Sequence, residues 1–139
     1  MSVSFFPTVP YPDEIGVNMS YSSFGEVRQI LAGLIDKEFA DLIKEGYGEL
    51  LPSDFFNRYD KCCNRLKETV GDGFFELFNQ SDCESEMNKD ACKDFLEAMK
   101  GKDLNEIEWD YRRRQVENML KMMQIVVDSP KEDAVFKWW

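Results

Sequence analysis

The chain contains no histidine, the side chain that most often acts as a general base near neutral pH and most often binds a metal. Its absence excludes Ser-His-Asp and Cys-His catalysis, and also zinc sites built from cysteine and histidine. The two short glycine pairs, at 46–48 and 71–73, lack the length and the lysine of a phosphate-binding loop. Carboxylates acting with a cation such as Mg²⁺ remain as an enzymatic alternative. We expect a protein that is not an enzyme and that uses no cofactor.

The four cysteines are not spaced as metal ligands. A structural zinc site of four cysteines typically has two Cys-x₂₋₄-Cys pairs, whereas Cys62 and Cys63 are adjacent and Cys83 and Cys92 are nine residues apart. We expect Cys62, Cys63 and Cys92 to be reduced, buried thiols that pack as small apolar groups. Cys83 lies in a polar stretch and is expected to be exposed. No metal site is predicted.

Acidic residues dominate the charge of the chain, with 27 Asp and Glu against 17 Lys and Arg and a formal net charge of −10. This sign argues against direct contact with nucleic acid or an anionic membrane, and it favours a basic protein partner. Ten of the acids lie between positions 82 and 110, together with four lysines. This segment has three interpretations: a solvated helical face, a surface for a basic partner, and a calcium loop. The lack of the glycine and the terminal glutamate of an EF-hand disfavours the calcium loop.

The predicted partner surface combines carboxylates with aromatic side chains. The carboxylates supply charge complementarity, and an exposed aromatic ring supplies the desolvated anchor that dominates many interfaces. The predicted partner-binding residues are Glu84, Glu86, Asp90, Asp94, Glu97, Glu106, Trp109, Asp110 and Tyr111.

Three further groups have both a packing and a binding interpretation. Three consecutive arginines at 112–114 favour local ion pairs at four-residue spacing, with contact to an acidic partner as the alternative. Met122 falls outside the apolar stripe of its helix and is a candidate dimer contact. Trp138 and Trp139 either dock on a sheet or anchor an interface, and the alternation of the tail favours docking. The predicted arginine pairs are Glu108 with Arg112, Asp110 with Arg114, and Arg113 with Glu117.

One long helix, predicted over 103–127, positions most of these residues. Its apolar residues recur at three- and four-residue steps, Asp103 is a suitable N-cap, and Ser129-Pro130 ends it. A helix is predicted from a Ser23–Glu26 capping box onward, with a break near 33–36 before a second short helix that ends at Gly46. Further short helices are predicted over 52–71, at 74–78 and over 91–101, with a polar loop at 79–86. Strands are predicted at 3–6, 15–20 and 134–139, with the prolines after Phe6 limiting the first strand to a sheet edge.

We therefore expect one α+β domain over 1–139 that is predominantly helical, with four to six helices around the long helix and a small sheet from the N- and C-terminal segments. An all-α fold with extended termini is the alternative. We expect no signal peptide at the start of the chain, because the first six residues include no basic residue and no long apolar run follows, and no apolar run in the sequence reaches 18 residues. We expect a cytoplasmic location.

Together these features predict a small acidic, non-catalytic binding protein that inhibits or masks a basic partner. The same profile is common among phage inhibitors of host defence, such as anti-CRISPR proteins, and among bacterial immunity proteins. A nuclease or a nucleic-acid-binding complex is the preferred partner. The alternative, from a different class, is a structural subunit that self-associates, for example as a homodimer through the long helix.

Overall fold

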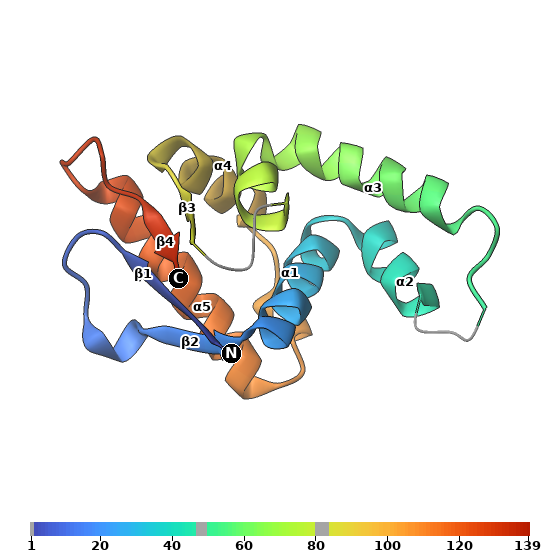
Figure 1. Cartoon of the computed structure of the whole chain (residues 1–139), viewed down its shortest axis with the longest axis horizontal. Helices are drawn as coiled ribbons and strands as arrows, with labels where there is room; N and C mark the ends of the chain where they lie inside the picture. Colours follow the sequence, from blue (N-terminus) through green and yellow to red (C-terminus); the bar gives the residue numbers. More distant parts are fainter. Residues whose placement is uncertain (1, 47–49, 80–83) are drawn as a thin grey trace.

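The computed structural model describes residues 2–46, 50–79 and 84–139 (Figure 1). This part of the chain is a predominantly helical α+β fold with a small antiparallel sheet, as predicted. The elements are β1 (Ser2–Pro7), η1 (Asp13–Ile15), β2 (Val17–Ser20), α1 (Tyr21–Ile35), α2 (Lys37–Gly46), α3 (Phe55–Val70), η2 (Phe74–Asn79), β3 (Ser85–Met87), α4 (Lys89–Met99), η3 (Leu104–Glu106), α5 (Asp110–Asp128) and β4 (Phe136–Trp138).

The sheet has the strand order β2-β1-β4-β3, and every neighbouring pair is antiparallel. Side chains alternate along each strand, so that one face is buried and the other points outward. Helix α5 packs against the buried face beside α4, while α1 contacts β2 (Figure 1). The buried strand residues are Val3, Phe5, Pro7, Val17, Met19, Ser85, Met87, Phe136 and Trp138.

Strand β1 lies inside the sheet, so the prediction that prolines confine it to an edge is wrong. The backbone N–H groups of Ser4 and Thr8 donate to the carbonyls of Trp139 and Val135, at 2.9 and 3.0 Å. By the alternation of a strand, the nitrogen of Pro7 therefore points toward β2. Pairing with β2 already ends at Phe5, so the N–H that proline lacks has no partner to lose.

Strand β3 occupies part of the predicted polar loop at 79–86. It is only three residues long and pairs with β4, with Glu86 opposite Lys137 and Met87 opposite Phe136. A strand this short, beside polar residues, shows too little alternation to be recognised in the sequence. Cys83, which was predicted to be exposed, lies outside the described residues.

Helix α5 begins at Asp110 and not at Asp103. Asp103 does act as an N-cap, because its Oδ1 accepts from the N–H of Asn105 at 2.9 Å, but it caps only the single turn of η3. Ile107 and Trp109 then take extended backbone conformations, and the buried Ile107 side chain holds this segment against the body. The predicted C-terminal end is confirmed, because α5 ends just before Ser129.

The start of α1 also differs from the prediction. Ser20 is the N-cap, and its Oγ accepts from the N–H of Ser23 at 3.2 Å. The helix therefore begins at Tyr21, before the predicted Ser23–Glu26 capping box. Glu26 is consequently on the helix surface, where its carboxylate is available to α5.

The tail confirms that Trp138 docks on the fold. Trp138 is fully buried, with its ring centroid 5.8 Å from that of Phe24 and 6.2 Å from that of Phe5, whereas Trp139 remains 59% exposed.

Met122 is fully buried, so its prediction as an exposed contact is wrong. Because α5 is covered by the sheet and by α4, its buried stripe is wider than that of a helix packed on one side.

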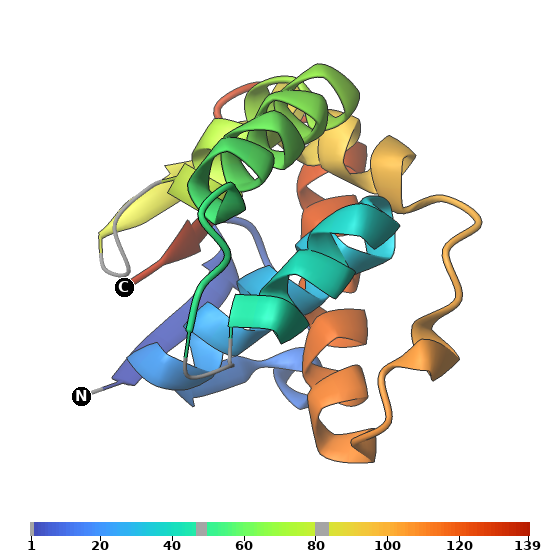
Figure 2. The same ribbon diagram turned by 90° about the vertical axis from the view of Figure 1, so that its right-hand side faces the viewer.

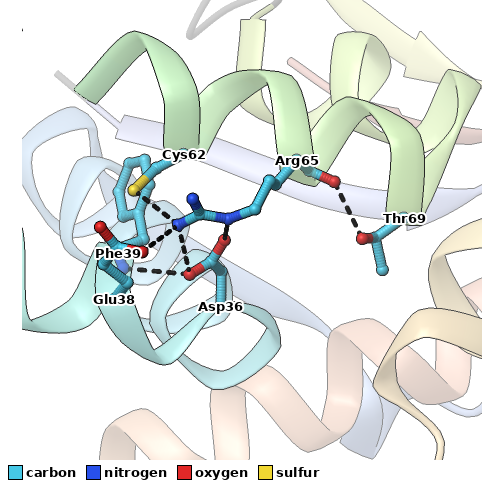
Figure 3. A network of polar contacts seen from close by, with 6 residues as sticks. All are labelled: Asp36, Glu38, Phe39, Cys62, Arg65 and Thr69. Carbon is cyan, nitrogen blue, oxygen red and sulfur yellow. Dashed lines mark hydrogen bonds and ion pairs between the residues drawn. The ribbon is translucent and has the colours of Figure 1, made fainter. Parts of the chain in front are cut away.

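Helices α2 and α3 extend together from the body, and we refer to residues 37–46 and 50–70 as the arm (Figure 1). A polar network joins the start of α2 to α3 (Figure 3). Asp36, at the end of α1, accepts from Arg65 Nε at 2.8 Å and from the N–H of Phe39 at 3.2 Å. Arg65 Nη2 also lies 2.9 Å from Glu38 and 3.1 Å from the Cys62 sulfur. The network fixes the angle at which α2 leaves α1.

We expect this network to make stability depend on acid pH. Burial opposes ionisation of Asp36, but the hydrogen bonds from Arg65 and Phe39 outweigh it and lower the pKa of Asp36. A lowered folded-state pKa adds stability above the unfolded-state pKa, and that stability is lost as the pH falls through the folded-state pKa. Urea unfolding should therefore show Asp36→Asn less stable than wild type at pH 7, with the difference shrinking below about pH 4. The exposed Asp41→Asn is the control, and an Asp36→Asn difference that persists undiminished at about pH 2.5 would contradict this account.

Candidate partner-binding surface

The nine predicted partner-binding residues are all exposed, but they lie in three separate places. The β3 edge presents Glu84 and Glu86. Helix α4 presents Asp90, Asp94 and Glu97, which are at helical spacing on one face. The start of α5 and the segment before it present the remaining four: Glu106, Trp109, Asp110 and Tyr111.

Helix α4 lies beside the C-terminal half of α5, since Lys89 Nζ donates to the backbone carbonyl of Ser129. In Figures 1 and 2, α4 and β3 lie toward the C-terminal end of α5 and away from its start. Across residues 84–99, all of which the structure describes, no large apolar side chain is exposed. The three α4 acids therefore have no aromatic anchor in their own segment, and their arrangement fits the solvated face. Glu86 on β3 instead lies opposite Lys137, whose Nζ is 4.9 Å from the ring centroid of the exposed Trp139.

The start of α5, by contrast, borders a groove of about 490 Å³. Figure 2 shows the segment before α5 passing alongside α1 and α2, and the groove lies between them. Its apolar floor consists of the half-buried side chains of Ile30 and Leu34 from α1 and Ile43 from α2. Trp109, which is 58% exposed, forms the opposite wall. We refer to this site as the α1–α5 groove.

The rim of the α1–α5 groove is charged. Glu106 and Glu108 lie on the side of the segment before α5, and Lys44 lies on the side of α2. The rings of Trp109 and Tyr111 are 5.4 Å apart between centroids, and Tyr111 is half exposed. The groove thus combines a wide apolar surface, an exposed indole and two carboxylates, which are the components that a protein interface requires.

A buried arginine positions the indole of Trp109. Arg112 is only 4% exposed, and its guanidinium carbon lies 4.9 Å from the centroid of a Trp109 ring. Arg112 Nη2 donates to Glu26 Oε2 and Nη1 to Gln115 Oε1, each at 2.7 Å. Because both terminal nitrogens of Arg112 are held by hydrogen bonds, the guanidinium forms a fixed support for the indole ring of Trp109.

These contacts replace the predicted arginine pairs. Glu108 precedes the helix and is not one turn from Arg112, which instead reaches across to Glu26 on α1. Arg113 pairs with Asp110 three residues earlier and donates to the carbonyl of Ile107. Arg114 is exposed. Local pairing is thus confirmed as the role of Arg113, but with a different partner.

The floor of the α1–α5 groove depends on a close approach of α1 and α2 at Gly33. A Cβ at Gly33 would lie 2.8 Å from the Cβ of Ala40, whereas one at Gly25 on the same helix meets nothing within 4 Å. We expect Gly33→Ala to lower the free energy of unfolding by about 1–3 kcal/mol, because the two helices must separate. Gly25→Ala should raise it by up to about 1 kcal/mol through helix propensity. Urea unfolding measures both, and equal effects would contradict the packing described.

Cys62 and Cys92 are fully buried and Cys63 is half buried, as predicted for packing thiols. Burial raises the pKa of Cys92 to about 12, which keeps its thiol protonated at neutral pH. Among the described residues, no group of three or more Cys, Asp or Glu side chains is arranged to hold a metal ion.

Two features of the surface were not predicted. Ile30, Leu34 and Ile43 have ordinary core spacing, and only the position of the segment before α5 shows that they line a groove. Near the end of the arm, Leu50 and Phe56 are 89% and 68% exposed. Phe56 falls off the apolar stripe of its helix, which is the sequence signal that would have identified it.

No protein-family model, no curated protein and no solved structure matches this chain. In the part of the chain that the structure describes, no helix has both the length and the apolar character needed to cross a membrane.

Proposed function

We propose that this chain is a small acidic, non-catalytic binding protein that inhibits or masks a basic partner protein. The partner class that best fits the charge is a nuclease or a nucleic-acid-binding complex, the kind of target on which phage anti-CRISPR proteins and bacterial immunity proteins act. The observation that carries this proposal is the α1–α5 groove, where exposed Trp109 faces an apolar floor beside Glu106 and Glu108.

Physical chemistry supports a division of roles between the groove and the overall charge. A formal charge of −10 accelerates the approach of a positively charged protein and repels nucleic acid. An aromatic ring next to apolar surface contributes most of the affinity once water is excluded. Trp109 is held in place by Arg112 before binding, so little conformational freedom is lost on association.

The alternative of a self-associating subunit has lost its predicted contact, because Met122 is fully buried. Trp109 and Tyr111 are exposed on a strongly acidic chain, and two like-charged copies repel each other at low salt.

The test is capture of bacterial proteins on the immobilised chain at about 50 mM and about 500 mM salt, followed by identification of what is retained. We expect basic proteins to be retained at low salt, and a retained nuclease to lose activity when the soluble chain is added. The variant Glu106→Lys with Glu108→Lys should lose this capture. Glu132→Lys with Asp133→Lys, in the turn before β4, has the same net charge and should keep it. Retention of no basic protein at low salt, or equal capture by both variants, would overturn the proposal.

A further inference from the structure

We propose that the α1–α5 groove binds an amphipathic helix of the partner, with a large apolar side chain placed between the apolar floor and Trp109 and with lysine or arginine facing Glu106 and Glu108. This inference rests on the proposed function and specifies the shape and chemistry of the segment that is recognised.

The floor of the groove has the form that receives a helix. Ile30 and Leu34 are one turn apart on α1, so their side chains form a ridge along that helix, and Ile43 of α2 extends it. Side chains at helical spacing on a partner fit between such ridges. This is the arrangement in which an amphipathic helix lays its apolar face into a groove, with anchors one turn apart.

An extended strand fits this groove less well than a helix. A strand binds by pairing its backbone with free N–H and C=O groups, and the only extended wall is the segment from Ile107 to Trp109. The N–H of Ile107 already donates to Leu104, and its carbonyl accepts from Arg113 Nη1. The carbonyl of Trp109 accepts from the N–H of Arg113. A helix satisfies its own backbone and needs none of these groups.

The charges of the rim set the orientation of the occupant. Glu106 and Glu108 are exposed on one rim, and Lys44 is exposed on the opposite rim. Glu26 is engaged by Arg112, so the carboxylates available for new contacts are those of Glu106 and Glu108. A helix with basic residues on one flank and neutral or acidic residues on the other complements both rims.

The experiment uses synthetic peptides of about 18 residues, long enough to form a helix on binding. One peptide has leucines on one face at helical spacing and lysines along one flank; its control has the same composition in scrambled order. Fluorescence anisotropy of the labelled peptides measures the dissociation constant with the full chain, and circular dichroism measures helix formation. We expect saturable binding of the amphipathic peptide with a gain of helicity, and at least about tenfold weaker binding of the scrambled peptide.

Variants of the chain locate the binding site. Trp109→Ala should weaken binding about tenfold, whereas Trp139→Ala removes an equally exposed indole elsewhere and should leave it unchanged. Glu106→Lys with Glu108→Lys should weaken binding at low salt, and Glu132→Lys with Asp133→Lys should not. Equal binding of the scrambled peptide, insensitivity to Trp109→Ala, or no saturable binding up to about 100 μM peptide would overturn the inference. If lysate capture still depended on Trp109 while the peptide failed, the proposed function would stand and only the helical occupant would be wrong.

Discussion

Trp138→Ala is expected to lower the free energy of unfolding by about 3–5 kcal/mol, the largest effect of any single substitution considered. The indole is fully buried and packs against Phe5, Phe24 and Phe136, which come from β1, α1 and β4. Truncation leaves a cavity where the two ends of the chain meet α1, and the surrounding rings can fill it only partly. For a chain of this length the loss corresponds to a melting temperature lower by about 10 °C or more.

The neighbouring residue provides the matched control for this prediction. Trp139 has the same side chain but is 59% exposed, and the Lys137 ammonium lies 4.9 Å from the centroid of its ring. Trp139→Ala should therefore cost no more than about 1 kcal/mol. Thermal and urea unfolding followed by circular dichroism compare the two variants. Similar destabilisation by both substitutions would show that the tail is not docked through Trp138.

Glu26→Ala is expected to cost about 2–3 kcal/mol, even though the Glu26 side chain is itself 62% exposed. The reason lies in its partner, because the Arg112 side chain is only 5% exposed and cannot recover hydration when the carboxylate is removed. Gln115 alone then remains to satisfy a buried cation. Urea unfolding should show this loss of stability. Glu26→Ala should also lower the affinity for a partner, since Arg112 supports Trp109.

Replacing the other member of the pair, Arg112, should lower the free energy of unfolding less, by about 1 kcal/mol. In Arg112→Met the carboxylate of Glu26 remains in water, and methionine fills much of the space of the arginine stem. The main loss is the hydrogen bond that Arg112 donates to the buried Gln115 side chain. Glu38→Ala is a further control, because Glu38 and its partner Arg65 are both well exposed, and this substitution should change stability least. A larger loss for Arg112→Met than for Glu26→Ala would contradict the view that the buried guanidinium is the sensitive group.

Local signals were sufficient to predict most of the elements. The break between α1 and α2, the helix up to Gly71, the buried turn at 74–78 and the C-terminal strand all follow from periodicity, capping residues and turn residues that act within a few positions. The alternation of the tail also predicted that Trp138 faces the core. In each case neighbours in sequence decide the structure, so the sequence alone is informative.

Predictions failed where distant residues decide the structure. The spacing of Leu104, Ile107 and Tyr111 fits a helix, but burial of Ile107 and the contact of its carbonyl with Arg113 favour an extended segment. Strand β3 forms because β4, some fifty residues later, supplies its hydrogen bonds. Pro7 is tolerated inside the sheet because β2 ends early.

The candidate site was predicted in part. Charge density and aromatic residues correctly indicated that Trp109, Tyr111 and the acids around them lie on the surface. Of the predicted residues, Glu106 and Trp109 border the α1–α5 groove, and Tyr111 adjoins it through its ring contact with Trp109. The same criteria included acids on β3 and α4 that lie elsewhere, since proximity in sequence does not ensure a shared surface. The floor from α1 and α2, and the Glu26–Arg112 pair that holds the indole, join segments 86 residues apart and have no local signature.

The most direct test of the whole account is calorimetric titration of a purified basic protein captured by this chain, at salt concentrations from about 50 to 300 mM. We predict that the affinity of the wild-type chain falls as salt rises, and that Glu106→Lys with Glu108→Lys reduces both the affinity and its salt dependence. Trp109→Ala should lower the affinity at every salt concentration while leaving the salt dependence unchanged. An affinity that is independent of salt and unaffected by these groove variants would contradict recognition through the charged α1–α5 groove.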